Sequence, residues 1–403
     1  MKKVIVVGAG ASGLMAAYAA AMNGNFVTVC EKNEKPGKKI YITGKGRCNV
    51  TNNTDPEGVL ANTVHNARFL KGAAYALPPE RLMSLLEEGG LPLKTERGNR
   101  VFPVSEKASD VTKCLERYCR NAGVQFRFGS KVTSIRKNGG CFSVQTGNEA
   151  LAADAVIVCT GGVSYPSTGS TGDGYSFARS FGLKVIPPRP ALCGIVCGGA
   201  EGLQGVSLKN VRLNAEAGGK SYSFFGEMLF THFGISGPVA LTLSSYINDV
   251  PASSVRIWLD LKPALDENTL DKRILRDFAV YINKRLGNAL VGLLPKALIL
   301  PVIRQAGVSP ETPVNMITKE QRGRLVQTLK HYRLLFRSLR PAEEGIVTAG
   351  GVDVGELDPR TMESRKVPGL YFCGEAIDVD ALTGGFNLQT AFMTGFAAGR
   401  AIH

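Results

Sequence analysis

The sequence predicts an α/β protein in which the two ends of the chain build one domain around an inserted domain of mixed β and helical character. Three observations predict this organisation. An apolar run, a glycine-rich turn and an alanine-rich stretch follow one another at the N-terminus, a similar series closes the chain, and the residues between them alternate short strand-like and helical patterns. The residue pattern changes at two proline-containing positions, Pro187 to Pro190 and Pro341. We therefore expect domain boundaries at 1–190, 191–340 and 341–403.

The first element is a strand over Val4 to Val7 that runs into a glycine-rich turn and then a helix. Gly8 allows the tight turn, Gly10 lets the backbone approach a pyrophosphate, and Gly13 lets the helix pack against the strand. Free N–H groups at the start of the helix can face phosphate oxygens. The turn therefore predicts a dinucleotide site in a Rossmann-like domain, the alternative being a purely structural glycine turn.

A second short apolar run ends at Glu31, about twenty residues after the turn, as in dinucleotide-binding folds. A carboxylate at the end of this strand can accept hydrogen bonds from ribose hydroxyls. The motif by itself leaves NAD and FAD open.

Residues 32–52 are rich in glycine, lysine and polar side chains and show neither helical nor strand periodicity. Since the segment is too long for a simple connector, we expect a functional loop over a ligand. Its glycines permit close approach to a ring system, and Arg47, Asn49 and Thr51 can supply directed hydrogen bonds. The cations from Lys32 to Arg47 are expected to neutralise cofactor phosphates.

Two helices and a hairpin are expected next. The helices span Pro79 to Glu88 and Lys107 to Ala122, the second with Ser105 as its cap. The hairpin joins strands at Lys131–Lys137 and Cys141–Thr146.

A buried strand follows at Ala155–Cys159 and ends in Thr160, Gly161 and Gly162. Such an apolar run suits a parallel strand buried on both faces, and the two glycines allow a ligand to pass closely. The strand is therefore expected to return to the first sheet, and a further helix is expected over Tyr175 to Phe181.

The inserted segment is expected to hold short strands within 191–225 and 254–261, and helices over Asp271–Leu286, Pro295–Ala306 and Lys319–Leu329. His232 lies in this segment, in a glycine-bounded loop with Thr231 and Ser236. We retain His232 as a candidate catalytic residue. The alternative is a structural histidine, because catalysis needs a hydrogen-bonded neighbour that a sequence does not show.

The end of the chain repeats the first pattern with different chemistry. A strand at Leu370–Cys373 ends in Gly374, and a turn from Gly384 to Asn387 opens a helix over Leu388–Ile402. The positive end of that helix can stabilise a reduced flavin, which carries negative charge beside its pyrimidine carbonyl. Two glycine-rich sites at opposite chain ends fit one long cofactor, which favours FAD over NAD.

Several segments give a specific resemblance. They are GAGASGL (8–14), TGKGRCNVTN (43–52), TGG (160–162), STGDGY (170–175), LFTHFGISGP (229–238), TAGGV (348–352) and GEAIDVDALTGGFNLQ (374–389). On these segments the chain resembles the BaiN/YhiN-like flavoproteins, also called the aminoacetone-oxidase-like family, of the glutathione-reductase-type FAD superfamily. The resemblance covers nearly the whole chain and implies FAD held by the first and last segments, with the inserted domain roofing the flavin. Ala381 departs from the family, which often has glycine there.

The residues expected to bind FAD come from both chain ends and from two middle segments. In flavoproteins of this arrangement the backbone at Val132 commonly meets the adenine, and Glu375 or Asp378 is placed to bind ribityl hydroxyls. The expected set is Gly8, Gly10, Ala11, Ser12, Gly13, Glu31, Lys32, Lys38, Gly44, Gly46, Arg47, Cys48, Asn49, Val132, Thr160, Gly161, Gly162, Gly374, Glu375, Asp378, Gly384, Gly385, Phe386, Asn387, Leu388 and Gln389. No metal ligands are expected.

The resemblance implies an FAD-dependent oxidoreductase that acts on a small organic molecule, and the basic chain would suit an anionic one. Family members are associated with reduction of conjugated C=C bonds in 3-oxo bile-acid-like steroids and with oxidation of small amines such as aminoacetone. We expect the reductase, with the amine oxidase and an RNA-modifying flavoprotein as alternatives. Since no second glycine fingerprint is visible, NADH or NADPH would bind transiently beside the flavin if either is the reductant.

Charge is the main indication of a partner. The chain has 403 residues and a formal net charge of +14, and the segment Lys319 to Arg340 carries seven cations with Glu320 as its single acid. A solvated helix face is expected there, with an anionic substrate or a nucleic acid as the alternative. The sequence argues against a nucleic-acid partner, because aromatic residues are not interleaved with the basic ones as in base-stacking surfaces.

The composition is that of a globular protein, with 44% hydrophobic and 20% charged residues. No apolar run suits a signal peptide or a membrane span, so we expect a cytoplasmic protein without membrane contact. Nine cysteines form neither a CxxC pair nor a zinc-ligand cluster, so most are expected in the core. Cys48 is expected to be a packed thiol, the alternative being a thiolate against the flavin. The oligomeric state is left open.

Overall fold

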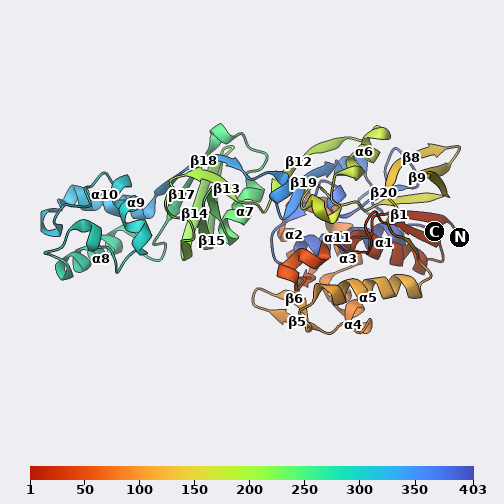
Figure 1. Ribbon diagram of the computed structural model, residues 1–403, viewed down its shortest axis with the longest axis horizontal. Coiled ribbons are helices and arrows are strands. Elements are labelled where there is room, and N and C mark those ends of the chain that lie inside the picture. Colours follow the sequence, from red (N-terminus) through yellow and green to blue (C-terminus); the bar gives the residue numbers. More distant parts are fainter. The chain divides into compact units, whose positions relative to one another are not determined.

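The structure, a computed structural model, describes all 403 residues of the chain. They form two compact units, shown with their elements in Figure 1. Unit 1 comprises residues 1–191 and 341–403, and unit 2 comprises residues 192–340. The predicted fold class is confirmed, since both chain ends build one α/β domain and the insertion contains a barrel and helices.

The centre of unit 1 is a five-stranded parallel sheet with the order β20–β11–β1–β2–β7. Its strands are β1 (Lys3–Val7), β2 (Phe26–Cys30), β7 (Gln125–Arg127), β11 (Ala155–Val158) and β20 (Leu370–Phe372). β1 and β11 are buried on both faces, which is why they read as unbroken apolar runs. Because the strands are parallel, the glycine turns after β1, β11 and β20 meet at one edge of the sheet.

Helices α1 (Ala11–Met22) and α11 (Phe386–Arg400) lie against each other (Figure 1) through small residues. A Cβ at Gly395 would lie 2.2 Å from the carbonyl oxygen of Ser12, and one at Gly399 would lie 2.3 Å from that of Ala16. The two backbones are therefore in direct contact, and side chains larger than hydrogen at these positions have no room.

The rest of unit 1 surrounds this centre. The other helices are α2 (Pro56–Ala61), α3 (Lys71–Ala76), α4 (Pro79–Glu88), α5 (Ala108–Asn121) and α6 (Asp173–Ser180). The smaller sheets are β3 (Thr51–Asn52) with β6 (Arg100–Pro103) and β5 (Leu93–Glu96), β8 (Val132–Asn138) with β9 (Cys141–Thr146) and β10 (Glu149–Ala153), β12 (Val185–Ala191) with β19 (Val347–Val352), and β4 (Thr63–His65) with β21 (Asp380–Ala381).

Unit 2 begins as a closed barrel with the strand order β13–β16–β15–β14–β17–β18. Its strands are β13 (Ile195–Gly198), β14 (Ser207–Ala217), β15 (Lys220–Thr231), β16 (Gly234–Ser236), β17 (Val255–Asp260) and β18 (Tyr332–Leu339). Its helices are α7 (Pro238–Tyr246), α8 (Glu267–Val280), α9 (Lys296–Gln305) and α10 (Lys319–Lys330). One core of buried aliphatic side chains runs through the barrel and the helices.

Several local predictions need correction. The predicted Ser105 cap is wrong: Lys107 occupies the cap position of α5 without a side-chain bond, and Glu106 takes a left-handed φ of 56° that turns the chain away from Ser105. The helix predicted over 271–286 is α8, which spans Glu267–Val280 and starts earlier because the Asp266 carboxylate caps its N-terminus. The helix predicted from Leu388 starts at Phe386.

Two further features differ from the sequence reading. The hairpin gains a third strand, β10, and the proline stretch at 187–190 lies within β12 in a two-stranded sheet, where prolines are tolerated. No helix of the chain has both the length and the apolar composition needed to cross a bilayer.

Candidate functional site

The glycine turn between β1 and α1 has the shape of a phosphate cradle. A Cβ at Gly8, whose φ is +100°, would lie 2.6 Å from the carbonyl oxygen of Cys159, and one at Gly13 would lie 1.9 Å from that of Gly8. The protein's own backbone therefore requires both glycines. Gly10 differs, since a Cβ there would meet no atom within 4 Å. The space beside Gly10 is open, as the approach of a pyrophosphate requires.

The first turn of α1 directs backbone donors at this space. Gly10 is the cap residue and brings no side chain, and the helical bonding begins with the Leu14 N–H donating to the Gly10 carbonyl at 2.9 Å. The N–H groups of Ala11, Ser12 and Gly13 therefore have no intrahelical acceptor. Together with the helix dipole they form an anion site.

Glu31 lies buried at the end of β2 and holds the glycine turn in place. Its Oε2 accepts the Ala9 N–H at 2.7 Å, and its Oε1 accepts the backbone and side-chain N–H groups of Asn33 at 2.8 and 2.7 Å. A carboxylate offers about four acceptor positions, so one remains for a ribose hydroxyl. The Glu31 carbonyl accepts the Ser130 N–H at 2.9 Å, which brings the segment leading to Val132 beside it.

The glycine-rich segment after β2 folds against the turn. The Gly37 N–H donates to the Ala9 carbonyl at 2.8 Å, and Gly44 and Gly46 take left-handed φ values of +56° and +85°. The buried Oδ1 of Asn49 has no protein partner. Cys48 is fully buried, and burial raises the pKa of its thiol to about 12, which fits a packed thiol rather than a thiolate.

The cations between Lys32 and Arg47 mostly face carboxylates of the protein. The pairs are Lys32 with Asp173 at 2.7 Å, Lys39 with Glu375 at 2.6 Å, Lys38 with Glu34 at 3.5 Å, and Arg47 with Glu96 and Glu106. The interpretation of this group as counter-charges for cofactor phosphates is therefore corrected. Contacts of Lys32, Lys38 and Arg47 with the cofactor remain predictions.

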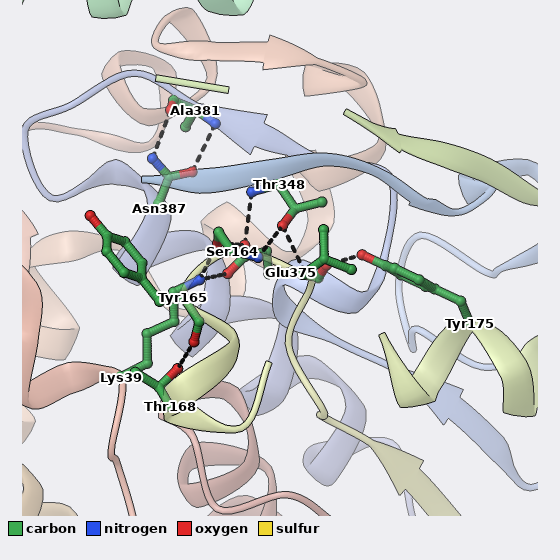
Figure 2. A network of polar contacts seen from close by, with 10 residues as sticks. Lys39, Ser164, Tyr165, Thr168, Tyr175, Thr348, Glu375, Ala381 and Asn387 are labelled. Atoms are coloured by element: carbon green, nitrogen blue, oxygen red, sulfur yellow. Dashed lines mark hydrogen bonds and ion pairs between the residues drawn. The ribbon is translucent and has the colours of Figure 1, made fainter. Parts of the chain in front are cut away.

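Glu375 is the centre of a polar network that joins several segments of unit 1 (Figure 2). Its Oε1 accepts the Ser164 hydroxyl at 2.7 Å and the Thr348 N–H at 2.8 Å, and its Oε2 pairs with Lys39. A Cβ at Gly162 would lie 2.3 Å from the Thr348 hydroxyl oxygen. The network therefore holds the turn after β11 against the C-terminal part of the chain.

Two predicted residues of the last motif use their side chains to hold the fold. The Asn387 side chain accepts the Ala381 N–H at 2.9 Å and donates to the Ala381 carbonyl at 2.7 Å, as Figure 2 shows. The Gln389 side chain accepts the Thr51 hydroxyl and donates to the Leu77 carbonyl, both at 2.7 Å. Ala381 has no positive φ, so the glycine that the family often has is not required here.

At the start of α11 the groups that remain available to a ligand are backbone N–H groups. Gly385 caps α11 with φ +101°, and a Cβ there would lie 2.3 Å from the Thr51 carbonyl oxygen. The first intrahelical bond is the Gln389 N–H to the Gly385 carbonyl at 3.0 Å. The N–H groups of Phe386, Asn387 and Leu388 therefore have no intrahelical acceptor and offer a second anion site.

The sequence reading missed a charged cluster next to this turn. Asp380 lies opposite His65 in the β21–β4 pair, and its Oδ1 is 2.5 Å from the His65 Nδ1. Three buried atoms of the cluster have no protein partner: Asp380 Oδ2, Asp378 Oδ1 and Arg189 Nε. The only signal in the sequence was the pair of aspartates in the last motif, since nothing local links them to His65 or Arg189.

The pair shifts the titration of both partners. Burial by itself would lower the pKa of His65, but the hydrogen bond and the charge of Asp380 outweigh burial and raise that pKa. Burial raises the pKa of Asp380, opposed by His65. The pair therefore holds its protons more tightly than the separate side chains would.

These features of unit 1 fit an FAD molecule. The open space at Gly10 and the donors of α1 suit a pyrophosphate, and the donors of α11 suit the anionic edge of a reduced flavin. Buried acceptors without a protein partner normally have a ligand or water, and Asn49 Oδ1 and Asp378 Oδ1 are two such atoms. Of the two acids expected at the ribityl chain, Asp378 has one oxygen without a protein partner, whereas both oxygens of Glu375 have protein partners.

Thr160 and Gly161 lie in unit 1, whereas the candidate catalytic residue His232 lies in unit 2. Thr160 accepts the Gly174 N–H through its hydroxyl at 3.1 Å, and Gly161 has φ +72°. His232 lies in unit 2, exposed at the turn between β15 and β16, with its ring edge-on to Phe233 at 5.1 Å between centroids. A catalytic role for His232 remains a prediction.

Comparison with known proteins identifies the family of the chain and several relatives, two of which are described here. The family described as "HI0933-like protein Rossmann domain" matches residues 2–401. The chain is 32% identical over 399 residues to the ribosomal RNA dihydrouridine synthase of Escherichia coli (strain K12), covering 98% of this chain and 96% of that protein. It is 31% identical over 417 residues to the 3-dehydro-bile acid delta(4,6)-reductase of Clostridium scindens, covering 100% and 99%.

A solved structure shows the same fold. The 3-ketosteroid-delta4-(5alpha)-dehydrogenase from Rhodococcus jostii RHA1, in complex with 4-androstene-3,17-dione, matches with a TM-score of 0.54 at 16% identity, covering 100% of this chain and 96% of that one. At this identity the likeness concerns the fold alone.

Proposed function

Because the chain belongs to the HI0933-like Rossmann-domain family of FAD-dependent oxidoreductases, we propose that it reduces a carbon–carbon double bond conjugated to a carbonyl group. The observation that carries the proposal is the chemistry that the names of the two relatives share. A dihydrouridine synthase saturates the ring double bond of a uracil, and a 3-dehydro-bile acid delta(4,6)-reductase saturates double bonds in line with a 3-oxo group. Both bonds are activated by a neighbouring carbonyl.

The residues of unit 1 divide the work around the cofactor. FAD bound in unit 1 would supply the hydride for such a bond, with NADH or NADPH as the source of the electrons and solvent as the source of the proton. The turn at Gly10 would hold the pyrophosphate, Glu31 would hold the adenosine ribose, and the first turn of α11 would stabilise negative charge on the ring. The His65–Asp380 pair lies beside that turn, and the hydrogen bond and charge of Asp380 raise the pKa of His65.

A uracil base within RNA is the first candidate substrate. The E. coli relative acts on ribosomal RNA by its name, and this chain carries a net charge of +14. Unit 2 has a larger share of that charge than its length predicts, with 19 Lys and Arg residues against 11 Asp and Glu residues. Such an excess favours association with a phosphate backbone.

A small 3-oxo enone of the bile-acid or steroid type is the second candidate. The C. scindens relative favours it, because its name specifies that class and its identity to this chain is nearly the same. The surface charge of the chain would also suit an anionic small molecule.

Anaerobic flavin spectroscopy tests both candidates. We expect NADH or NADPH to bleach the flavin of the purified protein, and either a uridine-containing ribosomal RNA transcript or a 4-en-3-one steroid to restore its colour. Mass spectrometry of the acceptor should show a gain of two hydrogen atoms. The reductase proposal is wrong if neither nucleotide bleaches the flavin while a small amine does.

A further inference from the structure

We propose that the outer face of strands β14, β17 and β18 in unit 2 is a docking surface for single-stranded RNA. The inference rests on the proposed function, because it assigns a place on the chain to the proposed RNA substrate. The surface, called the barrel face below, consists of Arg212, Asn214, Trp258, Arg333 and Arg337 of these strands, with His331 from the residue directly before β18.

Strand register assembles the barrel face from distant parts of the sequence. Trp258 of β17 lies opposite Asn214 of β14 on one side and Arg333 of β18 on the other. Ile257 and Leu259, the neighbours of Trp258 along the strand, are buried in the barrel core. Since successive side chains of a strand point to opposite faces, Trp258 and its cross-strand partners point outward.

The aromatic part of the barrel face is a pair of stacked rings. Trp258 is the only tryptophan of the chain, and its ring lies 6.1 Å from that of His331 with an angle of 24° between the planes. His331 is exposed and Trp258 is half-buried. Rings held in this way are platforms on which unpaired bases stack.

The basic segment Lys319–Arg340 supplies the cations, but only from its second half. In α10, Arg322 pairs with Asp271 at 2.6 Å and Arg324 with Glu320 at 2.9 Å, and Lys330 pairs with Asp260 at 2.6 Å. Three of the four cations of α10 are therefore balanced by protein carboxylates.

The cations of the barrel face have no such partners. Arg333 and Arg337 of β18 are exposed, and neither side chain forms an ion pair with a carboxylate of the chain. Arg212 of β14 is also exposed, with its guanidinium 3.5 Å from the Ser223 hydroxyl. Glu216 is the one exposed acid on the three strands, and Arg256 lies opposite it.

This combination favours RNA over other anionic partners. Unpaired arginines on both sides of stacked rings match a polymer that alternates phosphates with planar bases. An acidic peptide would satisfy the arginines but leave the Trp258–His331 platform without a partner. Register places Trp258 of β17 between β14, which carries Arg212, and β18, which carries Arg333. The folded chain therefore has aromatic and basic residues side by side that are remote from each other in the linear sequence.

The single tryptophan makes the test direct. The FAD-loaded full-length protein is titrated at low salt with a uridine-rich single-stranded RNA oligonucleotide, and tryptophan fluorescence is compared with the anisotropy of labelled RNA. We expect both signals to saturate at the same RNA concentration. The Arg333→Ala/Arg337→Ala variant should weaken binding at least about tenfold, and Trp258→Leu, followed by anisotropy, should do so by a similar factor.

A charge-matched control distinguishes RNA binding at the barrel face from non-specific electrostatic attraction to the protein. Lys272→Ala/Arg276→Ala removes two exposed cations from α8 and should change the affinity less than about threefold. Circular dichroism and flavin content should be unchanged in every variant. The inference is overturned if the control weakens binding as much as the β18 variant, if polyglutamate quenches Trp258 as RNA does, or if the wild-type protein binds no RNA at low salt.

The outcomes separate this inference from the proposed function. Absence of RNA binding together with reduction of a steroid enone by the wild-type protein would refute the docking surface and leave the reductase proposal standing. RNA binding at the barrel face without reduction of either acceptor would do the reverse.

Discussion

The three glycines of the first turn differ in what a side chain would meet at each. Gly8 and Gly13 face backbone carbonyls of the protein itself, whereas Gly10 faces open space. The first two glycines are therefore needed for the fold, whereas the protein itself leaves room for a side chain at Gly10, which we expect a ligand to use.

We expect Gly10→Ala to weaken FAD binding without changing the stability of the apoprotein. The φ of −76° suits alanine, so the free energy of unfolding should change by less than about 0.5 kcal/mol. The added methyl group would fill the space for the pyrophosphate, so the Kd for FAD should rise at least about tenfold. FAD titration and urea unfolding of the apoprotein measure the two effects.

Gly13→Ala is the matched comparison. Its methyl group would overlap the Gly8 carbonyl oxygen, so the apoprotein itself should lose about 1–3 kcal/mol of stability. An unchanged affinity for FAD in the Gly10 variant would place the pyrophosphate elsewhere.

His65 should make the stability of the protein fall as the pH rises. Its pKa in the folded state lies above the ordinary 6.5, so the folded protein binds this proton more tightly than the unfolded chain does. The contribution is fully present below pH 6.5 and is lost as the pH rises through the folded pKa. His65→Gln should remove this part of the pH dependence in urea unfolding.

The cause of the shift can be tested separately. In Asp380→Asn only the smaller effect of the Asp378 charge still opposes the burial of His65, so NMR titration should show its pKa falling below 6.5. A His65 pKa that is unaffected by this substitution would mean that the ion pair does not set it.

At the scale of elements, the contact between α1 and α11 joins the two glycine turns. The helices begin at the two glycine turns and run with their backbones in contact at Gly395 and Gly399. Their spacing therefore depends on the absence of side chains at these two positions.

Two effects of Gly395→Ala on the stability of the protein have opposite signs. Helix propensity alone predicts a gain of up to about 1 kcal/mol, whereas overlap with the Ser12 carbonyl oxygen predicts a loss of about 1–3 kcal/mol. We expect the loss, measured by calorimetry as a lower Tm.

Gly323→Ala in α10 is the control for that substitution. A Cβ there would meet no atom within 4 Å, so only the gain in helix propensity should appear. A higher Tm in both variants would contradict the close contact between α1 and α11.

At the scale of the whole molecule, the insertion leaves the α/β domain intact because the chain leaves this domain and returns to it at neighbouring positions. Ala191, the last residue of β12, pairs with Val347 of β19, so the chain leaves unit 1 and re-enters it at one pair of strands. The excess of positive charge in unit 2 then places the main electrostatic attraction for a polyanion on the inserted part.

The sequence by itself determined the α/β class, the use of both chain ends and the bounds of α4, and it placed α9 and α10 within a residue at each end. These features depend on local rules: glycine sterics, helical periodicity and apolar runs. Only the tertiary structure decided that His65 lies opposite Asp380, that Lys32 and Arg47 face carboxylates, and that Trp258 stands between Asn214 and Arg333. Each of these pairs joins residues remote in sequence, and contacts between them follow from strand register and chain packing, for which a single sequence carries no local signal.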